Sequence, residues 1–159
     1  MELRAPSGYD GAMPQIEGLL TGRKLLTLAG SATVLDAARL MAEHNVGCVL
    51  ITDGHQRPLG IFTERDLMTR VVVPGKDPDE VALVEVMTRD LYTAEKTSRI
   101  ADARRELQAR HIRHLPVVQG EVAIAMLSLR DLLAADLAAT KFEKRAMTEY
   151  IQGSPPDLS

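Results

Sequence analysis

The sequence contains an internal repeat, and this repeat restricts the possible folds more than any other feature. Residues 26–41 align with residues 92–107 at an offset of 66 positions. One position is then lost in a turn, and TERDL at residues 63–67 aligns with SLRDL at residues 128–132. A long period with a one-residue slip in a turn indicates a duplicated structural unit.

Each copy predicts a strand, a helix, two strands and a second helix, from the apolar spacing and the turn residues between segments. In the first copy the predicted strands are 25–28, 48–52 and 59–62, and the predicted helices are 34–41 and 64–71. In the second copy the predicted strands are 91–94, 115–118 and 122–127, and the predicted helices are 98–110 and 129–151, the last with a break. A short helix is expected at residues 84–87, before the second copy.

Neither copy alone, at roughly 55–60 residues, buries enough surface for comfortable stability. We therefore predict an α/β (α+β) fold of two pseudo-symmetric β-α-β-β-α modules packed sheet to sheet. The predicted parts are a flexible N-terminus at 1–15, a first module at 16–73, a linker at 74–83, a second module at 84–140, and a helical extension with a tail at 141–159.

The composition excludes several classes of function. Aromatic residues make up 3% of the chain and Trp is absent, whereas platforms for oligonucleotides and sugars use exposed aromatic rings. A net charge of −3 gives no sign of the basic surface that nucleic-acid binding needs. No apolar stretch approaches the ~20 residues that cross a bilayer, and residues 1–15 lack a signal pattern. We expect a cytoplasmic protein with neither nucleic acid nor membrane as partner.

The residues needed for catalysis are also missing from the sequence pattern. The single cysteine, Cys48, lies in an apolar run and is expected to be a small buried core residue. There is no nucleophile motif, no histidine set with metal-ligand spacing and no glycine-rich phosphate loop. His44 and His55 are expected at the surface. We predict a non-enzyme without a catalytic cofactor or a metal.

Four short segments carry a family resemblance. They are VGCVLI at 46–51, GIFTERDL at 60–67, HLPVV at 114–118 and SLRDL at 128–132. Together they resemble the tandem cystathionine-β-synthase (CBS) motif of small stand-alone prokaryotic proteins, over about residues 16–137. The resemblance implies a disc-like pair with a cleft between its sheets and two pseudo-equivalent pockets. It also implies binding of AMP, ADP, ATP, NAD(H) or S-adenosylmethionine, and a dimer of discs.

The repeated Thr/Ser-x-x-Asp spacing predicts ribose binding. Thr63 and Asp66 begin one helix, and Ser128 and Asp131 begin another. An ionised carboxylate accepts hydrogen bonds from a vicinal diol, and free N–H groups of a first helical turn accept a phosphate oxygen. The alternative is that the hydroxyls are ordinary N-caps and the aspartates complement the helix dipole. We favour ribose binding because the spacing recurs at matching places.

The adenine pocket is assigned by resemblance. Its apolar walls would come from the start of each first helix and from the approach to each second strand, namely Leu28, Val46, Gly47, Ala94, Ile112 and Pro116. Gly47 would let the backbone approach the purine closely. All of these residues would also fit an ordinary apolar core.

The second copy supplies the candidate phosphate-binding cations. Arg113 and His114 precede a buried strand, and Arg suits bidentate phosphate contacts. Arg70 and Lys76 are further candidates, although a solvated basic turn, a charged helix end and a linker explain these four residues as well. The first copy is uncharged at the place of Arg113, so the two pockets cannot be equivalent. Ala125 replaces Gly60 in the second copy and is expected to narrow that pocket.

The resulting hypothesis is a regulatory sensor of energy or redox state. An adenine nucleotide, with AMP favoured because few basic groups surround the cleft, would shift the population of conformations shown to an effector protein. The alternative is a ligand-free homodimerisation or interaction module using the last helix. Under that alternative, alanine at Asp66 or Asp131 is expected to leave stability nearly unchanged.

Overall fold

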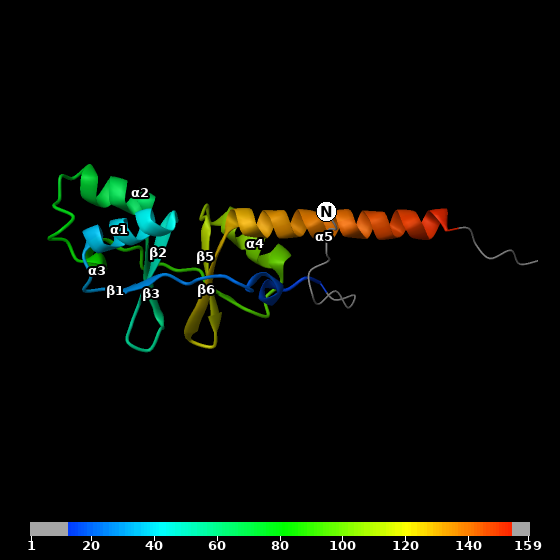
Figure 1. Ribbon diagram of the computed structural model, residues 1–159, viewed down its shortest axis with the longest axis horizontal. Helices are drawn as coiled ribbons and strands as arrows, with labels where there is room; N and C mark the ends of the chain where they lie inside the picture. The colour runs from blue at the N-terminus through cyan, green and yellow to red at the C-terminus, as the bar shows by residue number, and fades with distance from the viewer. Residues whose placement is uncertain (1–12, 154–159) are drawn as a thin grey trace, which may run out of the picture. The chain divides into compact units, whose positions relative to one another are not determined.

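The computed structural model describes residues 13–153 as an α/β protein with two three-stranded sheets, shown in Figure 1. The first half contains β1 (Thr27–Ala29), α1 (Val34–His44), β2 (Cys48–Thr52), β3 (Pro58–Thr63), α2 (Glu64–Asp66) and the π-helical turn η2 (Leu67–Val72). The second half contains β4 (Ala94–Glu95), α4 (Ile100–Ala109), β5 (His114–Gln119), β6 (Val122–Ser128) and α5 (Leu129–Gln152). Each half is preceded by a short helix, η1 (Ile16–Leu19) and α3 (Leu83–Val86). The predicted fold class and the repeated element order are confirmed.

The chain divides into two compact units. The larger unit contains Gly22–Lys96 and His114–Leu127, and the smaller unit contains the described parts of Met1–Thr21, Thr97–Arg113 and Ser128–Ser159. The larger unit therefore holds the strands of both sheets, and the smaller unit holds η1, α4 and α5.

The first sheet has the order β1-β2-β3, with β1 parallel to β2 and β2 antiparallel to β3. All five residues of β2 are buried, as its continuous apolar run predicts. One face packs on α1 and α3. Its core cluster comprises Val34, Ala37, Met41, Val49, Ile51, Phe62, Val71, Leu83, Val86 and Met87.

The other face of this sheet is buried as well. Cys48 and Leu50 alternate with the core residues of β2 and so point to the opposite face. The amide of Ala123 in β6 donates to the Gln56 carbonyl at 3.0 Å. This bond ties the β2–β3 turn to the second sheet within the larger unit.

Helix α1 shows why these residues form a helix here. Thr33 Oγ1 accepts from the Asp36 amide at 3.1 Å, and Asp36 Oδ2 accepts from the Thr33 amide at 3.0 Å. This capping box satisfies two N–H groups at the helix start. The helix ends at Asn45, whose φ of 51° lies in the left-handed region that Asn tolerates.

The starts of α1 and α4 are each paired with a distant segment of the chain. The start of α1 pairs with residues 81–83, which precede the second half, and the start of α4 pairs with residues 14–16, which precede the first half. In the larger unit, Val34 N donates to the Val81 carbonyl and Leu83 N to the Ala32 carbonyl, at 2.9 and 2.8 Å. The smaller unit repeats the pattern, because Ile100 N donates to the Pro14 carbonyl and Ile16 N to the Ser98 carbonyl, both at 2.9 Å. Residues 13–15 of the predicted flexible N-terminus thus lie against α4. Residues 1–12 fall outside the described part of the chain.

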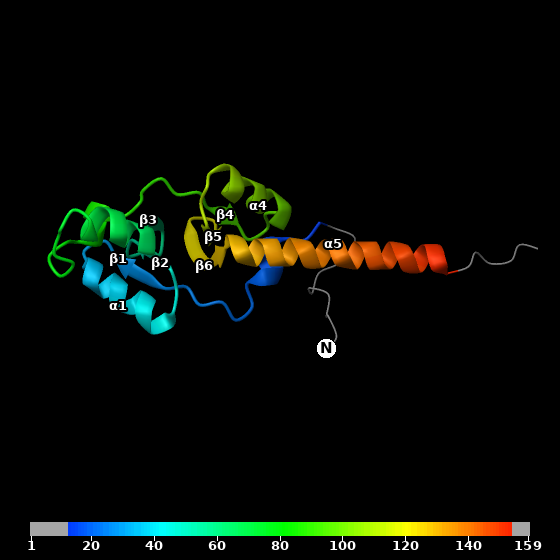
Figure 2. The same ribbon diagram turned by 90° about the horizontal axis from the view of Figure 1, so that it is seen from above.

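The last helix differs from the prediction. Helix α5 runs without a break over 24 residues, because no Gly or Pro interrupts it, so the predicted break is wrong. Figure 2 shows it as one continuous helix with α4 beside it. Arg104 Nε pairs with Asp136 Oδ2 at 2.7 Å between these two helices, and Leu132 and Ala139 are buried.

Candidate functional site

We call each start of a helix with the Thr/Ser-x-x-Asp spacing a corner: the first contains Thr63 and Asp66, and the second contains Ser128 and Asp131. The first corner joins β3 to α2. Thr63 N and Thr63 Oγ1 both donate to Asp66 Oδ2, at 3.0 and 3.1 Å, while Asp66 N donates to Thr63 Oγ1 at 3.2 Å. The side chain of Asp66 is buried, with 7% of the residue exposed. The N-cap interpretation of these two residues is therefore confirmed, and ribose binding stays a prediction.

Asp66 also contacts the segment that follows α3. Thr88 Oγ1 donates to Asp66 Oδ1 at 3.3 Å, and Arg70 Nε lies 3.6 Å from the same oxygen. Arg70 Nη1 donates to the carbonyls of Val86 and Met87, both at 3.0 Å. Arg70 thus ties the last turn of α3 to the helical segment 64–72. Its predicted phosphate role remains without a contact that supports it.

The backbone of Gly47 lies beside this corner. Glu64 N donates to the Gly47 carbonyl at 3.0 Å. A Cβ at Gly47 would lie 3.4 Å from Glu64 Oε2 and 3.7 Å from His114 Nε2. The structure therefore brings His114, predicted from the second copy, next to the first corner. Sequence reasoning missed Glu64, although its place directly after the cap residue Thr63 would have suggested it.

Cys48 follows Gly47 and points into the buried face of the sheet. Burial raises the pKa of its thiol to about 12, and the nearby Glu64 carboxylate contributes to the increase. The thiol is therefore neutral near pH 7 and unsuited to act as a nucleophile. This agrees with the predicted role as a core residue.

The second corner repeats the first in the smaller unit. Ser128 N donates to Asp131 Oδ2 at 2.8 Å, and Asp131 N donates to Ser128 Oγ at 3.1 Å. Leu129 N donates to the Arg113 carbonyl at 2.8 Å. The side chain of Arg113 is exposed. The two corners therefore share one backbone frame but differ in their side chains.

The remaining predicted residues fall into three groups. Leu28 and Val46 are partly buried and pack on the core cluster of the first sheet. Ala94 and Pro116 are buried in the larger unit, whereas Ile112 is partly buried in the smaller unit. Lys76 is exposed after η2. For Lys76 the structure gives only a backbone contact, from its amide to the Val71 carbonyl at 2.9 Å.

Gly60 has a structural explanation. A Cβ there would lie 2.5 Å from Met87 Sδ and 3.0 Å from the Thr88 carbonyl oxygen. The neighbouring Ile61 exchanges two backbone hydrogen bonds with Thr88, at 2.9 and 2.8 Å, which fixes this close approach. The second copy has the buried Ala125 at this place, and its effect on a pocket remains a prediction.

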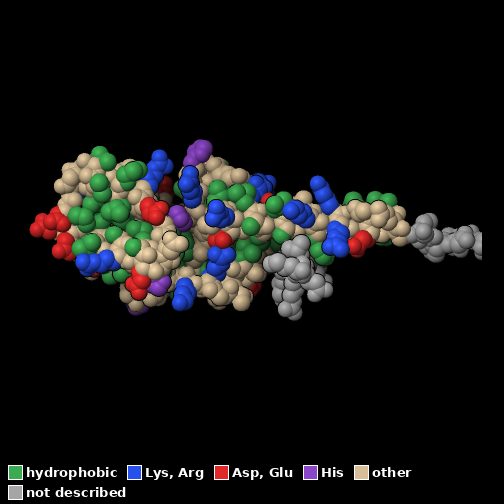
Figure 3. All heavy atoms as spheres, turned by 45° about the horizontal axis from the view of Figure 1, so that its top comes forward, with side chains coloured by type: hydrophobic (Ala, Val, Ile, Leu, Met, Phe, Trp, Pro, Cys, Tyr) green, Lys and Arg blue, Asp and Glu red, His purple; other side chains and the backbone are tan. Residues whose placement is uncertain are grey.

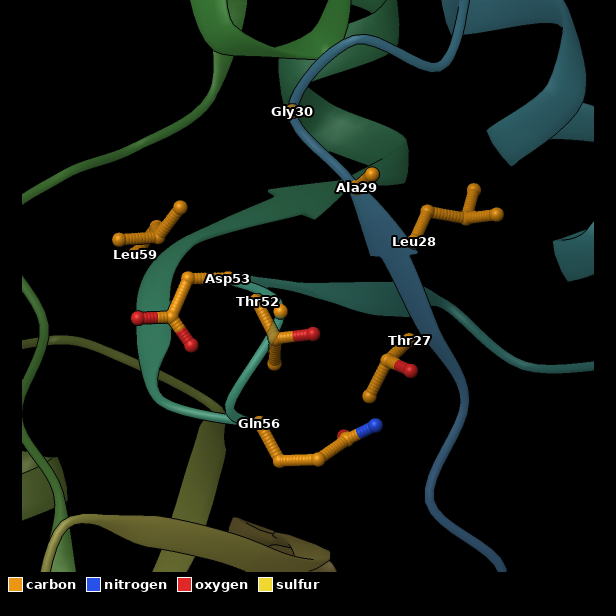
Figure 4. A pocket seen from close by; sticks show the side chains of 9 residues that line it. Thr27, Leu28, Ala29, Gly30, Thr52, Asp53, Gln56 and Leu59 are labelled. Carbon is orange, nitrogen blue, oxygen red and sulfur yellow. The ribbon is translucent and has the colours of Figure 1, made fainter.

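A pocket of about 490 Å³ lies at the C-terminal ends of β1 and β2. It is lined by Thr27, Leu28, Ala29, Gly30, Thr52, Asp53, Gly54, Gln56 and Leu59 (Figure 4). Leu28 is the only lining residue that the sequence analysis assigned to a site. Backbone hydrogen bonds, that from Arg57 foremost, lower the pKa of Asp53, so this carboxylate is ionised and held by its own turn.

The part of the chain from residue 13 to 153 contains no group of His, Cys, Asp and Glu side chains arranged to hold a metal ion. Within the same residues, no helix has the length and apolar character needed to cross a bilayer. On the face shown in Figure 3, basic and acidic side chains are interspersed.

One protein family and two curated relatives match most of the chain. The CBS domain family matches residues 18–73 and 83–138. The uncharacterized protein MK0525 of Methanopyrus kandleri is 32% identical over 120 residues, which cover 75% of this chain and 61% of that protein. The mitochondrial CBS domain-containing protein CBSX3 of Arabidopsis thaliana is 33% identical over 125 residues, which cover 76% of this chain and 61% of that protein. The match thus spans about 61% of the length of either relative.

Solved structures show the same architecture. A putative signal-transduction protein with CBS domains from Burkholderia ambifaria has a TM-score of 0.68 and 32% identity, covering 74% of this chain and 85% of that one. The CBS domain pair of protein MJ0100, in complex with 5′-methylthioadenosine and S-adenosyl-L-methionine, has a TM-score of 0.69 and 21% identity. It covers 82% of this chain and 99% of that one, and at this identity it supports the fold alone.

Proposed function

This chain belongs to the CBS-domain family, and we propose that it is a regulatory module that binds an adenine nucleotide and passes the binding event to a partner protein. AMP is the ligand we favour, ahead of ADP, ATP, NAD(H) and S-adenosylmethionine. No enzymatic family is indicated for this chain, and we assign it no catalytic step.

The repeated corner is the observation that carries the proposal. In both halves a hydroxyl residue and an aspartate three positions later form the same capping box. A carboxylate has about four acceptor sites, and the contacts of Asp66 Oδ1 are long, 3.3 Å to Thr88 Oγ1 and 3.6 Å to Arg70 Nε. A ribose diol therefore has an acceptor to bind at Asp66 without breaking the cap.

We take the adenosine-type ligand class of this proposal from MJ0100, whose likeness to this chain shows the fold alone. That CBS pair holds two adenosine compounds, and adenosine is their shared part. The family relation brings the ligand class to this chain as a proposal. The preference for a phosphate rests on Arg113, whose exposed guanidinium offers five N–H donors.

The proposed signal to the partner protein follows from a shift in the population of conformations. A ligand that prefers one arrangement of the chain changes the surface shown to a partner, by as much as its affinities for the two arrangements differ. We propose that the chain acts as a homodimer and that an effector protein responds to the changed surface. Since the relatives are longer than the matched region, the assignment concerns the CBS pair.

Thermal unfolding with each of the five compounds tests the proposal, with two alanine variants as the decisive pair. Asp66→Ala removes a candidate ribose contact together with a capping box. Asp36→Ala removes a capping box of the same geometry on α1, away from the corner. We expect AMP to raise the midpoint of the wild type and of Asp36→Ala, each against its own unliganded midpoint, and to raise that of Asp66→Ala by less, because only the second corner is left intact. Equal shifts in both variants would remove Asp66 from the site.

The interaction-module alternative has an observation of its own. Leu133, Leu137, Met147 and Ile151 of α5 are exposed by 41%, 56%, 67% and 73%. Their spacings of four residues place each pair on one helix face. A module that dimerises through this face needs no nucleotide, so the absence of any ligand-induced shift in the wild type would favour it.

A further inference from the structure

The pocket at the C-terminal ends of β1 and β2 is lined by polar side chains that the chain itself does not engage. Thr27, Thr52 and Gln56 lie together there in Figure 4. Within residues 13–153, the side chains of these three residues make no hydrogen bond. Thr52 is nevertheless buried, with 6% of the residue exposed. A buried hydroxyl without a partner destabilises a folded chain, so its presence here calls for an explanation.

The second half shows that the fold does not need the Thr52 hydroxyl. The parallel pairs Ala29–Thr52 in the first sheet and Glu95–Val118 in the second occupy matching places, at the repeat offset of 66 positions. Val118 is buried to the same degree as Thr52, with 7% exposed. A β-branched apolar residue therefore fits this strand position, and the hydroxyl is particular to the first half.

The same comparison explains why there is space at this strand end. In the second half, the Glu95 carboxylate reaches the turn of its own sheet and accepts from the Gly120 amide at 3.4 Å. The first half has Ala29 and Gly54 at those places, and both residues line the pocket. Because alanine has no side chain that can extend from strand to turn, the first half leaves open the space that Glu95 crosses in the second.

Gln56 presents its amide to the pocket from an unfavourable backbone conformation. Its φ is 62°, in the left-handed region that favours glycine. The amide of Gln56 donates to the Asp53 carbonyl at 3.1 Å, and the Gln56 carbonyl accepts from the Ala123 amide at 3.0 Å. Glycine would make both bonds with less strain. The turn itself therefore gives no reason for a glutamine, whereas the position of its side chain does.

The pocket offers little net charge to an ion. Asp53 is the one charged residue among the described residues that line it. Its Oδ1 accepts from the amides of His55 and Arg57, and its Oδ2 accepts from Arg57 Nε, all at 2.9 Å. The carboxylate is thus balanced by Arg57 and held by its own turn. Leu59, exposed by 43%, adds apolar surface. These features favour an uncharged ligand with one polar and one apolar side.

We propose that this pocket binds an uncharged small molecule through a planar amide edge, such as a carboxamide on an apolar ring. The Gln56 side chain and such an edge each carry a donor and an acceptor side by side, so two hydrogen bonds can join them. The hydroxyls of Thr27 and Thr52 can donate to or accept from the remaining groups. The volume of about 490 Å³ suits a small molecule. The pocket shares no residue with the corners, so the proposal is independent of the proposed nucleotide site.

Nicotinamide and nicotinate test the proposal, because they carry a carboxamide and a carboxylate on the same ring. In ¹H–¹⁵N NMR of the full chain, the side-chain amide of Gln56 reports on the pocket directly. We expect nicotinamide, titrated beyond a Kd of about 1 mM, to shift this signal and the backbone amides of Thr27 and Thr52. Nicotinate should bind at least about tenfold more weakly, because no cation compensates its charge there.

Two variants remove the polar groups without harming the fold. Thr52→Val introduces the residue that the second half has at this place. It should weaken nicotinamide binding by about tenfold and leave the thermal midpoint unchanged or higher. Gln56→Gly introduces the residue that suits a φ of 62°. It should abolish nicotinamide binding in a protein at least as stable as the wild type.

A third variant fills the space, and a fourth is the matched control. Ala29→Glu copies the side chain of Glu95 and should abolish nicotinamide binding. Thr93→Val, at the place of Thr27 in the second half, should bind nicotinamide as the wild type does.

An unchanged wild-type spectrum in the presence of nicotinamide, or equal binding of nicotinate, would overturn the proposal. Wild-type binding by Gln56→Gly and Ala29→Glu would overturn it too. A lower thermal midpoint of Thr52→Val would also count against it, since the hydroxyl would then serve the fold. All of these results leave the proposed function untouched, because AMP binding at the corners is measured separately.

Discussion

The Thr88 hydroxyl donates to Asp66 Oδ1 at 3.3 Å, and Thr88 also exchanges both backbone hydrogen bonds with Ile61 in β3. Thr88, in the segment between α3 and β4, therefore contacts the candidate ribose acceptor and the edge of the first sheet. A ligand that takes over Asp66 Oδ1 competes with Thr88, which gives ligand binding a direct mechanical connection to the segment leading into the second half.

The stability of Asp66→Ala follows from these contacts. The variant loses a capping box and the Thr88 hydrogen bond at a buried position, and we expect a loss of about 2 kcal/mol in the free energy of unfolding. Asp36→Ala, which loses only an exposed capping box, should lose about 1 kcal/mol. Urea unfolding of both variants measures the difference. Equal losses would show that Thr88 contributes nothing, and wild-type stability in Asp66→Ala would agree with the ligand-free alternative.

Arg70 is predicted to act on stability. Arg70→Met removes the two donors that hold the carbonyls of Val86 and Met87, and we expect it to lower the free energy of unfolding by about 1–2 kcal/mol. AMP affinity, measured by calorimetry at a temperature where the variant is folded, should stay within about twofold of the wild type. A large loss of AMP affinity with unchanged stability would make Arg70 a phosphate ligand after all.

Cys48 is predicted to make the protein less stable at alkaline pH. Its folded pKa of about 12 exceeds the ordinary value of 9.0, so above pH 9 the unfolded chain releases the thiol proton while the folded chain retains it. The contribution of the neutral thiol to the free energy of unfolding is fully present below pH 9. It is lost as the pH rises towards 12, with a slope approaching about 1.4 kcal/mol per pH unit. The difference in unfolding free energy between wild type and Cys48→Ala, measured from pH 8 to 10.5, should shrink or reverse. A constant difference would contradict a buried neutral thiol.

The exposed face of α5 predicts self-association. The double change Leu137→Lys and Met147→Lys places two positive charges on this face. It should dissociate a homodimer that uses the face. Ala138→Lys, at an exposed position of the same helix, is the control for added charge. Sedimentation equilibrium of the three proteins measures the change. A monomeric wild type, or a dimer that survives the double change, would place the interface elsewhere or remove it.

The sequence repeat predicted most of the local structure. Strand β2 has the predicted bounds, because five consecutive apolar or β-branched residues read as a strand buried on both faces. The caps at Thr63 and Ser128 were also predictable, since an N-cap needs only a hydroxyl at the right place in the chain.

Contacts between distant segments were beyond sequence reasoning. Gly60 is required by Met87, which lies far along the chain, and Arg70 is held by carbonyls that any residue would supply. The pairing of Ile16 with Ser98 likewise depends on backbone groups, which leave no signal in residue identity. The corners were therefore found from sequence, but the partners that decide their chemistry were not.

A titration with AMP followed by ¹H–¹⁵N NMR tests the central claim most directly, because every backbone amide reports its own environment. We predict that the largest shift changes fall on the amides of the two corners, at residues 63–66 and 128–131, and on the loops that contact them, at Gly47 and Arg113. A spectrum that AMP leaves unchanged, or changes confined to the pocket around Thr27 and Thr52, would contradict binding at the repeated corners.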